Sequence, residues 1–378
     1  MKVAIIEPHL VDYTGHYYSF VSELKRGFEE LGDQVEVFLP ANLKADINGT
    51  SMMPLSPISP KACLLKRYKS FLRDTLKLVE VIKDAQQSSD LLIFSTADDG
   101  RILAAIGLFK TARPAILYFH TLPALINRKM KSWKLFVFLV RLRKPKNLYF
   151  LTTSGIDRDI KMPSFPSNVK LLPGAPYPFN IPVPLSRPDN TNVIYLAYMG
   201  APAKQKNFPK FVELISNSPE NYGFIVQCNV PSCFYESDIL DAVQSLKRLK
   251  RENTILLESS LSKENYYKAL NQSSIVWCLY DRDLYKGSIS GILIEAWVLG
   301  KPVLTTAGTW MAKQVEKFGG GIALDPSTLR NILAAIERIR AEYPRFSREA
   351  ESAGTAFYEK NNGPVLARFI KESLEKIP

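Results

Sequence analysis

Short apolar runs alternate with longer segments of helical period along the first half of the chain. The runs, which are typical of buried β-strands, span residues 3–6, 35–39, 91–94, 115–119 and 148–151. Between them lie amphipathic segments, such as 16–31, 64–81 and 103–110. This alternation predicts βαβ units, and therefore a parallel sheet covered by helices.

A proline-rich segment interrupts the pattern. Residues 173–190 hold six prolines and show little periodicity, which predicts a linker between two domains. The alternation then restarts, with strands expected at 193–199, 223–227, 254–257, 275–279, 303–304 and 321–324. We therefore expect two doubly wound α/β domains in tandem. In such sheets ligands bind at the carboxyl ends of the strands.

Composition narrows the class of protein. The 378 residues are 46% hydrophobic and 23% charged, as expected for soluble domains. No apolar run approaches the roughly 18 residues of a spanning helix, and the start of the chain lacks a secretory pattern, so we expect a cytoplasmic protein. Four scattered cysteines and three histidines give little support to a zinc site, and we expect no metal.

Positive charge is concentrated in the first half. The net charge is +12, and residues 1–180 hold 25 Lys and Arg against 16 Asp and Glu, a balance of +9. Such a surplus indicates an anionic partner. We expect no nucleic acid, because no recognisable binding module accompanies the charge.

Segment 127–146 is the most unusual of the basic segments. Lys and Arg flank an apolar centre that contains Trp133, Phe136, Val137 and Val140. This pattern predicts a helix that lies on an anionic membrane surface, on the inner face of the cell membrane. The alternative is a helix packed on the sheet with solvated charges.

The segment 287–304, GSISGILIEAWVLGKPVL, predicts a binding site at a helix start. Ser288, Ser290 and Gly291 precede or open the helix, where unpaired N–H groups favour phosphate. Glu295 lies one turn further on, where a carboxylate can accept hydrogen bonds from a ribose diol. The alternative is that Ser290 caps the helix and Glu295 offsets its dipole. The residues alone leave both interpretations open.

This segment resembles the signature E-x-F-G-x-x-x-x-E-A-x-x-x-G-x-P-V of retaining glycosyltransferases of the GT-B fold, group-1 type. The matching residues are Gly291, Glu295, Ala296, Gly300, Pro302 and Val303. Other segments resemble parts of the family in the same order: 12–40, 118–123, 195–208, 255–280 and 311–324. The resemblance implies two Rossmann-like domains that face each other across a cleft, and transfer of a sugar with retention at the anomeric carbon.

The resemblance also implies roles for individual residues in the donor domain. Ser288, Ser290 and Gly291 would lie near the diphosphate of a nucleotide sugar, with Lys206, and Glu295 would bind the ribose. Two positions depart from the family pattern: Gly287 stands where a first Glu is common, and Ala201 where Arg is common. Lys204 is a candidate substitute for that Arg, although Lys lacks the bidentate fork.

In the first domain the resemblance implies an acceptor side. His120 corresponds to a histidine that contacts sugar hydroxyls or manages a proton. Gly15 and His16 correspond to a glycine loop that can approach a phosphate. We expect an acceptor-side domain over residues 1–180, a donor domain over 181–345, and helices over 346–378 that cross back to the first domain.

The sequence therefore predicts a hexosyltransferase that uses a nucleotide sugar as substrate, without cofactor or metal. The expected acceptor is a glycan or a lipid-linked sugar in bacterial surface-glycan synthesis. Two alternatives stay open. One is a catalytically impaired GT-B subunit that binds nucleotide sugar or glycan and supports a partner transferase. The other is a nucleotide-sugar 2-epimerase, which shares the two-domain architecture.

Overall fold

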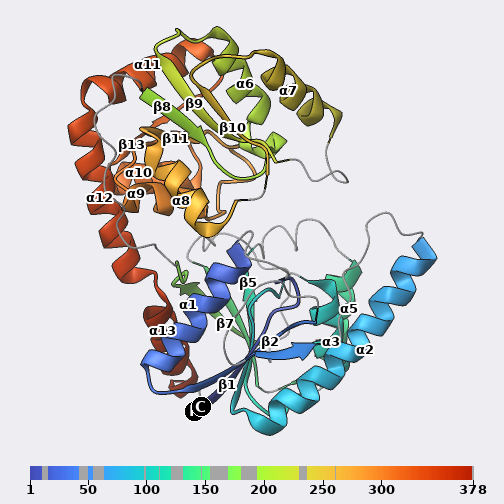
Figure 1. Ribbon diagram of the computed structural model, residues 1–378. Helices are drawn as coiled ribbons and strands as arrows, with labels where there is room; N and C mark the ends of the chain where they lie inside the picture. Colours follow the sequence, from blue (N-terminus) through green and yellow to red (C-terminus); the bar gives the residue numbers. More distant parts are fainter. Residues whose placement is uncertain are drawn as a thin grey trace. The chain divides into compact units, whose positions relative to one another are not determined.

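The chain divides into two compact units in the computed structural model (Figure 1). Unit 1 comprises Met1–Asn180 and Lys360–Pro378, and unit 2 comprises Ile181–Glu359. The structure describes residues 1–10, 16–41, 50–53, 64–97, 99–109, 111–120, 131–145, 147–153, 169–179, 194–229, 236–259 and 261–376. No helix among these residues is both long and apolar enough to span a bilayer.

Unit 1 contains a parallel sheet with the strand order β3-β2-β1-β4-β5-β6-β7. The strands are β1 (Lys2–Ile6), β2 (Gln34–Pro40), β3 (Thr50–Met53), β4 (Leu91–Phe94), β5 (Ala115–Phe119), β6 (Leu148–Thr153) and β7 (Lys170–Ala175). The five predicted strands of this half are present. Residues 173–175, which we predicted as linker, belong to β7 instead. Pro173 can occupy this strand because β7 is an edge strand, where a missing N–H is tolerated.

Helices cover both faces of this sheet. On one face lie α2 (Leu64–Ser88), α3 (Gly100–Leu108) and α5 (Lys131–Arg143), whose buried side chains share a core with Ala4 and Ile6. On the other lie α1 (His16–Glu30) and α13 (Gly363–Glu375), which share a core with Val3 and Ile5. Alternate residues of β1 thus face opposite cores, as the pleat requires.

The structure corrects our interpretation of the apolar centre of segment 127–146. Trp133, Phe136 and Val140 are buried between α5 and the sheet, so they are not available to a membrane. A different stripe of the helix is exposed: Phe138 is 62% exposed and Leu142 68%. The core face of an amphipathic helix and its exposed apolar stripe cannot be separated by composition alone.

The last helix closes unit 1. Gly27 of α1 and Gly363 of α13 allow the two backbones to approach closely, because a Cβ at Gly363 would lie 1.8 Å from the carbonyl oxygen of Glu23. Nearby, Lys371 donates to both carboxylate oxygens of Asp33, at 2.8 and 3.0 Å. Figure 1 shows α13 beside α1.

Unit 2 repeats the architecture with the order β10-β9-β8-β11-β12-β13. Its strands are β8 (Ile194–Tyr198), β9 (Tyr222–Gln227), β10 (Thr254–Leu257), β11 (Ile275–Cys278), β12 (Val303–Thr306) and β13 (Gly321–Leu324). Its helices are η1 (Lys204–Lys206, a 3₁₀ turn), α6 (Phe208–Asn217), α7 (Ser237–Arg248), α8 (Lys263–Gln272), α9 (Gly291–Val298), α10 (Trp310–Phe318), α11 (Leu329–Ala341) and α12 (Tyr343–Lys360). Every strand pairing within the described residues of both units is parallel.

Both sheets have one point where the strand order reverses. In unit 1 it lies between β1 and β4, and in unit 2 between β8 and β11. The loops that follow these strands diverge to opposite sides and leave a crevice at the carboxyl ends, which is where doubly wound sheets bind ligands. The two switch points therefore define where each unit's site is expected.

Candidate functional site

Lys206 lies at the switch point of unit 2. The turn η1 follows β8 and is tied to the end of β11, because Trp277 donates its indole N–H to the Lys206 carbonyl at 3.1 Å and the Asp281 N–H donates to the Gln205 carbonyl at 2.8 Å. These bonds hold the Lys206 backbone between the two strands that flank the switch point.

The ammonium of Lys206 is largely buried beside Gly200 and Tyr280. Burial lowers the pKa of Lys206, and this effect exceeds the opposing influence of Cys278 and Glu295. Its Nζ lies 5.8 Å from the ring centroid of Tyr280 and has no hydrogen-bond or ion-pair partner in the part of the chain that the structure describes. Gly200 makes room for it: a Cβ there would lie 2.8 Å from Nζ, and the backbone has φ +96°. An anion is the partner that such a group favours.

Glu295 of α9 lies close enough to influence Lys206, but it is held by two phenols of α8. Tyr266 donates its hydroxyl to the carboxylate at 2.7 Å, and Tyr267 at 3.4 Å. Burial, followed by the charge of Glu295, raises the pKa of Tyr266 well above its usual value. Both hydroxyls therefore stay protonated donors, and Glu295 stays an acceptor. Sequence reasoning did not single out these tyrosines.

The start of α9 completes this group of residues. Ser290 is the N-cap residue with extended backbone, but its side chain does not cap the helix. It is buried and hydrogen-bonds to Tyr280 instead. The first N–H groups of α9, from Gly291 onward, therefore lack a side-chain cap and are available to a ligand. Ser288 lies nearby in the chain and donates its hydroxyl to the Leu284 carbonyl at 3.0 Å.

Polar side chains also gather at the switch point of unit 1. Glu7, directly after β1, is completely buried and accepts hydrogen bonds from the hydroxyls of Ser95 (2.8 Å) and Thr96, which follow β4. The N–H of His9 donates to the same carboxyl group at 2.8 Å. Burial raises the pKa of Glu7, against the opposing effect of His9 and these hydrogen bonds.

His120 lies at the same edge, directly after β5. Its Nε2 is 2.9 Å from the carbonyl oxygen of Ser95. Because a carbonyl only accepts, Nε2 carries the proton. The imidazole contacts the rings of Phe20 and Tyr177, with centroids 4.9 and 6.0 Å away. The predicted acceptor-side histidine is therefore fixed at the strand edge where ligands bind.

No protein-family model matches the sequence, and a comparison with curated proteins finds no relative. Solved structures match over nearly the whole chain. Sucrose-phosphate synthase from Thermosynechococcus elongatus is 14% identical with a TM-score of 0.68, covering 100% of this chain and 98% of that one. HepE from Anabaena, solved with UDP and glucose, is 14% identical with a TM-score of 0.69, covering 99% of both chains. WaaB, a lipopolysaccharide outer core galactosyltransferase, is 13% identical with a TM-score of 0.60, covering 99% of both.

The chain has the GT-B fold. This confirms the two-domain α/β architecture that the sequence predicts. In GT-B terms, the residues around Lys206 and Glu295 belong to the second Rossmann-like sheet, and those around Glu7 and His120 to the first.

Lys204 does not join Lys206. Its side chain is 68% exposed and pairs with Asp238 (3.2 Å) and Glu236 (3.9 Å) at the start of α7. The hydrogen bond with Asp238, and then the charges of both acids, raise its pKa. Lys204 thus stays charged and pairs with surface acids, whereas the sequence suggested it as a substitute for the missing Arg. Ala201 and Gly287, the two departures from the family pattern, are both exposed.

The predicted loop residues Gly15 and His16 lie at the boundary of the described structure. Gly15 lies outside the described residues, and of His16 only the backbone is described, as the first residue of α1.

Within the described ranges, no three His, Cys, Asp or Glu side chains are grouped so that they could hold a metal ion. Asp281, which begins a D-x-D pattern, accepts the Leu284 N–H at 2.9 Å.

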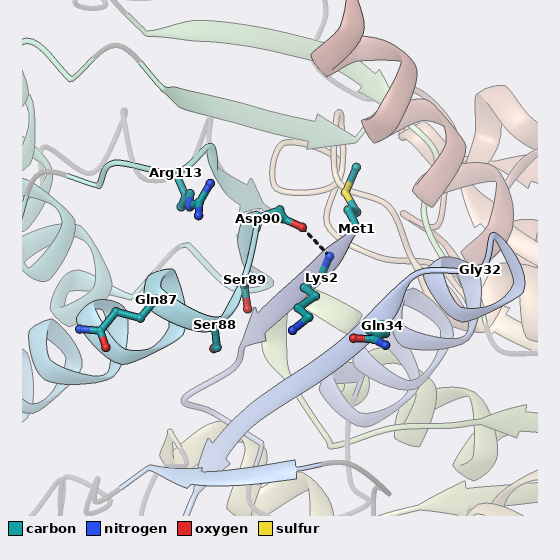
Figure 2. A pocket seen from close by; sticks show the side chains of 9 residues that line it. All are labelled: Met1, Lys2, Gly32, Gln34, Gln87, Ser88, Ser89, Asp90 and Arg113. Atoms are coloured by element: carbon teal, nitrogen blue, oxygen red, sulfur yellow. Dashed lines mark hydrogen bonds between the residues drawn. The ribbon is translucent and has the colours of Figure 1, made fainter.

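A cavity of about 470 Å³ lies at the opposite edge of the unit 1 sheet (Figure 2). Lys2, Gln34 and Asp90, at the amino ends of β1, β2 and β4, contribute to its lining, and Asp90 accepts the Lys2 N–H at 2.9 Å. Its position at the amino ends is the wrong edge for a ligand of a doubly wound sheet, so we do not assign a function to it.

Proposed function

We propose that the chain is a glycosyltransferase that binds a nucleotide-sugar donor at the switch point of unit 2. The observation that carries the proposal is the half-buried Lys206 ammonium, which lacks an ion-pair partner in the described structure and lies near Glu295. It also faces Tyr280, which hydrogen-bonds to Ser290 at the uncapped start of α9. A diphosphate would provide the missing negative charge, and the helix N–H groups would bind its oxygens. Glu295 would accept the ribose hydroxyls.

The leaving nucleoside diphosphate would be stabilised by Lys206 and α9, without a metal. Preorganised donors of this kind can contribute several kcal/mol to catalysis. The solved relatives support the donor class, since HepE was solved with UDP-glucose. Retention at the anomeric carbon and a hexose as the transferred sugar rest on the resemblance of 287–304 to the group-1 signature. The anomeric coupling constant of the product, measured by NMR, tests retention.

Thermal-shift and calorimetric titrations with UDP, GDP and their hexose conjugates test the donor site. We expect one nucleotide to raise the melting temperature equally with and without EDTA. Lys206→Met should weaken its binding by roughly 10- to 100-fold, because a hydrogen-bonded charge is lost. Glu295→Gln should weaken it less.

A matched control is Lys247→Met, since Lys247 is an exposed residue of α7 that pairs with the surface carboxylate of Glu258. Equal loss of affinity in Lys206→Met and Lys247→Met would contradict the site. A shift abolished by EDTA would contradict the metal-free proposal. Tight binding without turnover of any nucleotide sugar would favour the alternative of a supporting GT-B subunit, and formation of a C2 epimer would favour the epimerase.

For the acceptor we propose a lipid-linked sugar or glycan in bacterial surface-glycan synthesis, bound at the carboxyl edge of the unit 1 sheet near His120. The basic balance of this half of the chain supports an acceptor with anionic groups. We propose that the imidazole of His120, which its Nε2 bond to the Ser95 carbonyl fixes at this edge, contacts the hydroxyls of the acceptor sugar.

We further propose that α5 docks unit 1 on an anionic membrane surface through its exposed stripe. Leu135, Phe138 and Leu142 are 46%, 62% and 68% exposed, and Lys134 and Arg141 on the same helix are exposed as well. Apolar side chains would enter the lipid interface, and each nearby basic residue would contribute on the order of 1 kcal/mol.

Sedimentation with phosphatidylcholine vesicles, with and without phosphatidylglycerol, tests this surface. We expect binding only with the anionic lipid, weakened roughly tenfold by Phe138→Ser through lost burial. Leu240→Ser is the control, because Leu240 is a 42% exposed residue on α7 of unit 2. Binding that is equal in both variants would exclude the α5 stripe as the docking surface.

A further inference from the structure

Tyr280 is a buried residue of unit 2 whose side chain lies against two parts of the proposed donor site. It follows β11 by two residues, is 2% exposed, and donates its N–H to the Cys278 carbonyl at 2.9 Å. The Nζ atom of Lys206 lies 5.8 Å from the centroid of its ring. Its hydroxyl hydrogen-bonds to Ser290 at the start of α9. One ring thus connects the ammonium with the helix start.

The ring of Tyr280 is held in place by the loop that follows it. It packs edge-on against the ring of Tyr285, with centroids 4.7 Å apart. Tyr285 is itself fixed, because its N–H donates to the Asp281 carbonyl at 3.1 Å and its carbonyl accepts the Trp310 N–H at 2.8 Å. Burial raises the pKa of Tyr280 well above its usual value, so the hydroxyl keeps its proton at neutral pH. Ser290 therefore has a permanent hydroxyl partner.

Ser290 has the backbone of a helix cap but does not form the hydrogen bond of one. Its φ of −121° and ψ of 117° are extended, as is typical of an N-cap residue. A serine hydroxyl in this position usually accepts the N–H of the second or third helical residue, here Ile292 or Leu293. In other helices of the same unit the N-cap hydroxyl does accept the N–H three residues on: Ser262 in α8, Thr309 in α10 and Thr328 in α11.

The bond between Tyr280 and Ser290 also has a structural explanation, because buried hydroxyls are almost always hydrogen-bonded. That explanation does not account for the loss of the cap, which usually favours a formed helix by a factor of roughly 3 to 30. It also does not account for the position of Lys206, whose ammonium lies over the same ring and lacks an ion-pair partner in the described part of the chain. An anion between the ammonium and the helix start would explain both features.

We propose that Tyr280 is a positioning residue of the donor site, which holds the Ser290 hydroxyl so that the first N–H groups of α9 stay available to the diphosphate. This inference rests on the proposed binding of a nucleotide sugar. The Ser290 hydroxyl and a phosphate oxygen compete as acceptors for the N–H groups of Ile292 and Leu293. The bond to Tyr280 removes the serine from this competition. A released Ser290 would cap α9 and would have to be displaced before phosphate binds.

Tyr280→Phe tests the role of the hydroxyl, because it keeps the ring that packs against Lys206 and Tyr285. Calorimetry with UDP and GDP should show binding that is roughly 3- to 30-fold weaker, the range that corresponds to one N-cap hydrogen bond. Tyr195→Phe is the matched control, because Tyr195 lies near the amino end of β8 with its ring against Gly223. Its affinity should equal that of the wild type.

A double-mutant cycle with Ser290→Ala separates positioning from direct contact. Without the Ser290 hydroxyl no competing cap exists, so adding Tyr280→Phe to Ser290→Ala should change the affinity by less than about twofold. A Tyr280 hydroxyl that binds the ligand itself, or that only supports the fold, would cost the same factor in both backgrounds. That result would overturn the inference.

Amide exchange measured by NMR without nucleotide examines the capping step itself. In Tyr280→Phe the N–H groups of Ile292 and Leu293 should exchange roughly 3- to 30-fold more slowly than in the wild type, because Ser290 then caps them. In the double variant with Ser290→Ala this slowing should disappear. Exchange that is unchanged in Tyr280→Phe would show that Ser290 does not move to the helix, and the inference would be wrong.

The outcomes separate this inference from the function on which it rests. If the wild type binds UDP or GDP and Tyr280→Phe binds it equally well, the role of Tyr280 is refuted and the donor site stands. If the wild type binds neither nucleotide, the donor-site proposal is refuted, and the role of Tyr280 in binding with it.

Discussion

Substitution of Gly363 by Ala probes the docking of the last helix. The added Cβ would lie 1.8 Å from the carbonyl oxygen of Glu23 and 3.2 Å from the backbone nitrogen of Gly27. Both are backbone atoms of a neighbouring helix and cannot rotate away as a side chain can. To restore an ordinary contact of 3.4 Å to the oxygen, α13 would have to withdraw by about 1.6 Å.

The expected loss of stability can be estimated from the contacts that this withdrawal of α13 disturbs. Forcing one methyl group into a packed interface costs about 1–3 kcal/mol. Leu366 and Ile370 are completely buried in the same interface, and exposing part of either adds to this, since full burial of such a side chain contributes about 1.5–3 kcal/mol. The better helix propensity of Ala returns at most about 1 kcal/mol. We expect a net destabilisation of α13 docking of about 2–4 kcal/mol.

Hydrogen exchange measured by mass spectrometry reports this loss of stability for individual helices. Amides of α1 and α13 should lose protection by roughly 30- to 1,000-fold, whereas unit 2 should be unaffected. Glu372→Ala is the control, because Glu372 is an exposed residue of the same helix whose pair with Lys376 contributes little. Protection in Gly363→Ala that stays within threefold of the wild type would refute the close-packing argument.

Three further predictions follow from the charged and phenolic groups. The pKa of Glu7 is raised, so the wild type loses stability as its buried carboxyl ionises with rising pH. The melting temperature of Glu7→Gln should therefore increase relative to that of the wild type between pH 5 and pH 8. A difference that stays constant over this range would contradict the argument. Lys371→Met should cost about 1 kcal/mol at neutral pH in urea unfolding. Burial would raise the pKa of Asp33, but Lys371 and the N-terminal amine outweigh it and lower that pKa. The stability that the pair contributes is therefore lost as Asp33 becomes protonated, and the cost of Lys371→Met should shrink as pH falls below 3.8. An unchanged cost at low pH would refute the pairing. Tyr266→Phe should weaken nucleotide-sugar binding by roughly fivefold in calorimetry, because Glu295 loses one of the two hydroxyl hydrogen bonds that hold it. Unchanged affinity would show that Tyr266 does not contribute to the site.

The sheets were predictable because their strands are continuous apolar runs. β1, β4 and β5 are buried on both faces, so their sequences contain almost no polar residue and are distinguished from the amphipathic helices around them. β3 and β7 escaped prediction for different reasons. β3 begins with Thr50 and Ser51 and so lacks a continuous apolar run, and β7 contains a proline and a glycine, which predict a linker.

The sites were predictable only where a local motif carries them. Glu295 and Gly291 stand four residues apart in one segment, and the structure keeps them on one short helix with Lys206 nearby. The partners of Glu295 come from α8, almost thirty residues earlier in the chain, and nothing local marks Tyr266 as facing it.

His9 and Asp99, whose side chains pair at the switch point of unit 1, show the same limitation more strongly. Ninety residues separate them, and their contact depends on which strands become neighbours. The alternation of strands and helices indicates that a parallel sheet forms but does not give the strand order. A strand-end histidine beside a strand-end acid becomes a pair only after that order is known.

The division of the chain has a consequence for its synthesis. Unit 1 is built from Met1–Asn180 and from Lys360–Pro378, with all of unit 2 between them. A ribosome thus releases every residue of unit 2 before it supplies the helix that covers the α1 face of unit 1. Domains usually fold as they emerge, from the N-terminal end. Here the core that α1 shares with α13, which includes Phe20 and Leu24, is completed only after residues 360–378 have been synthesised.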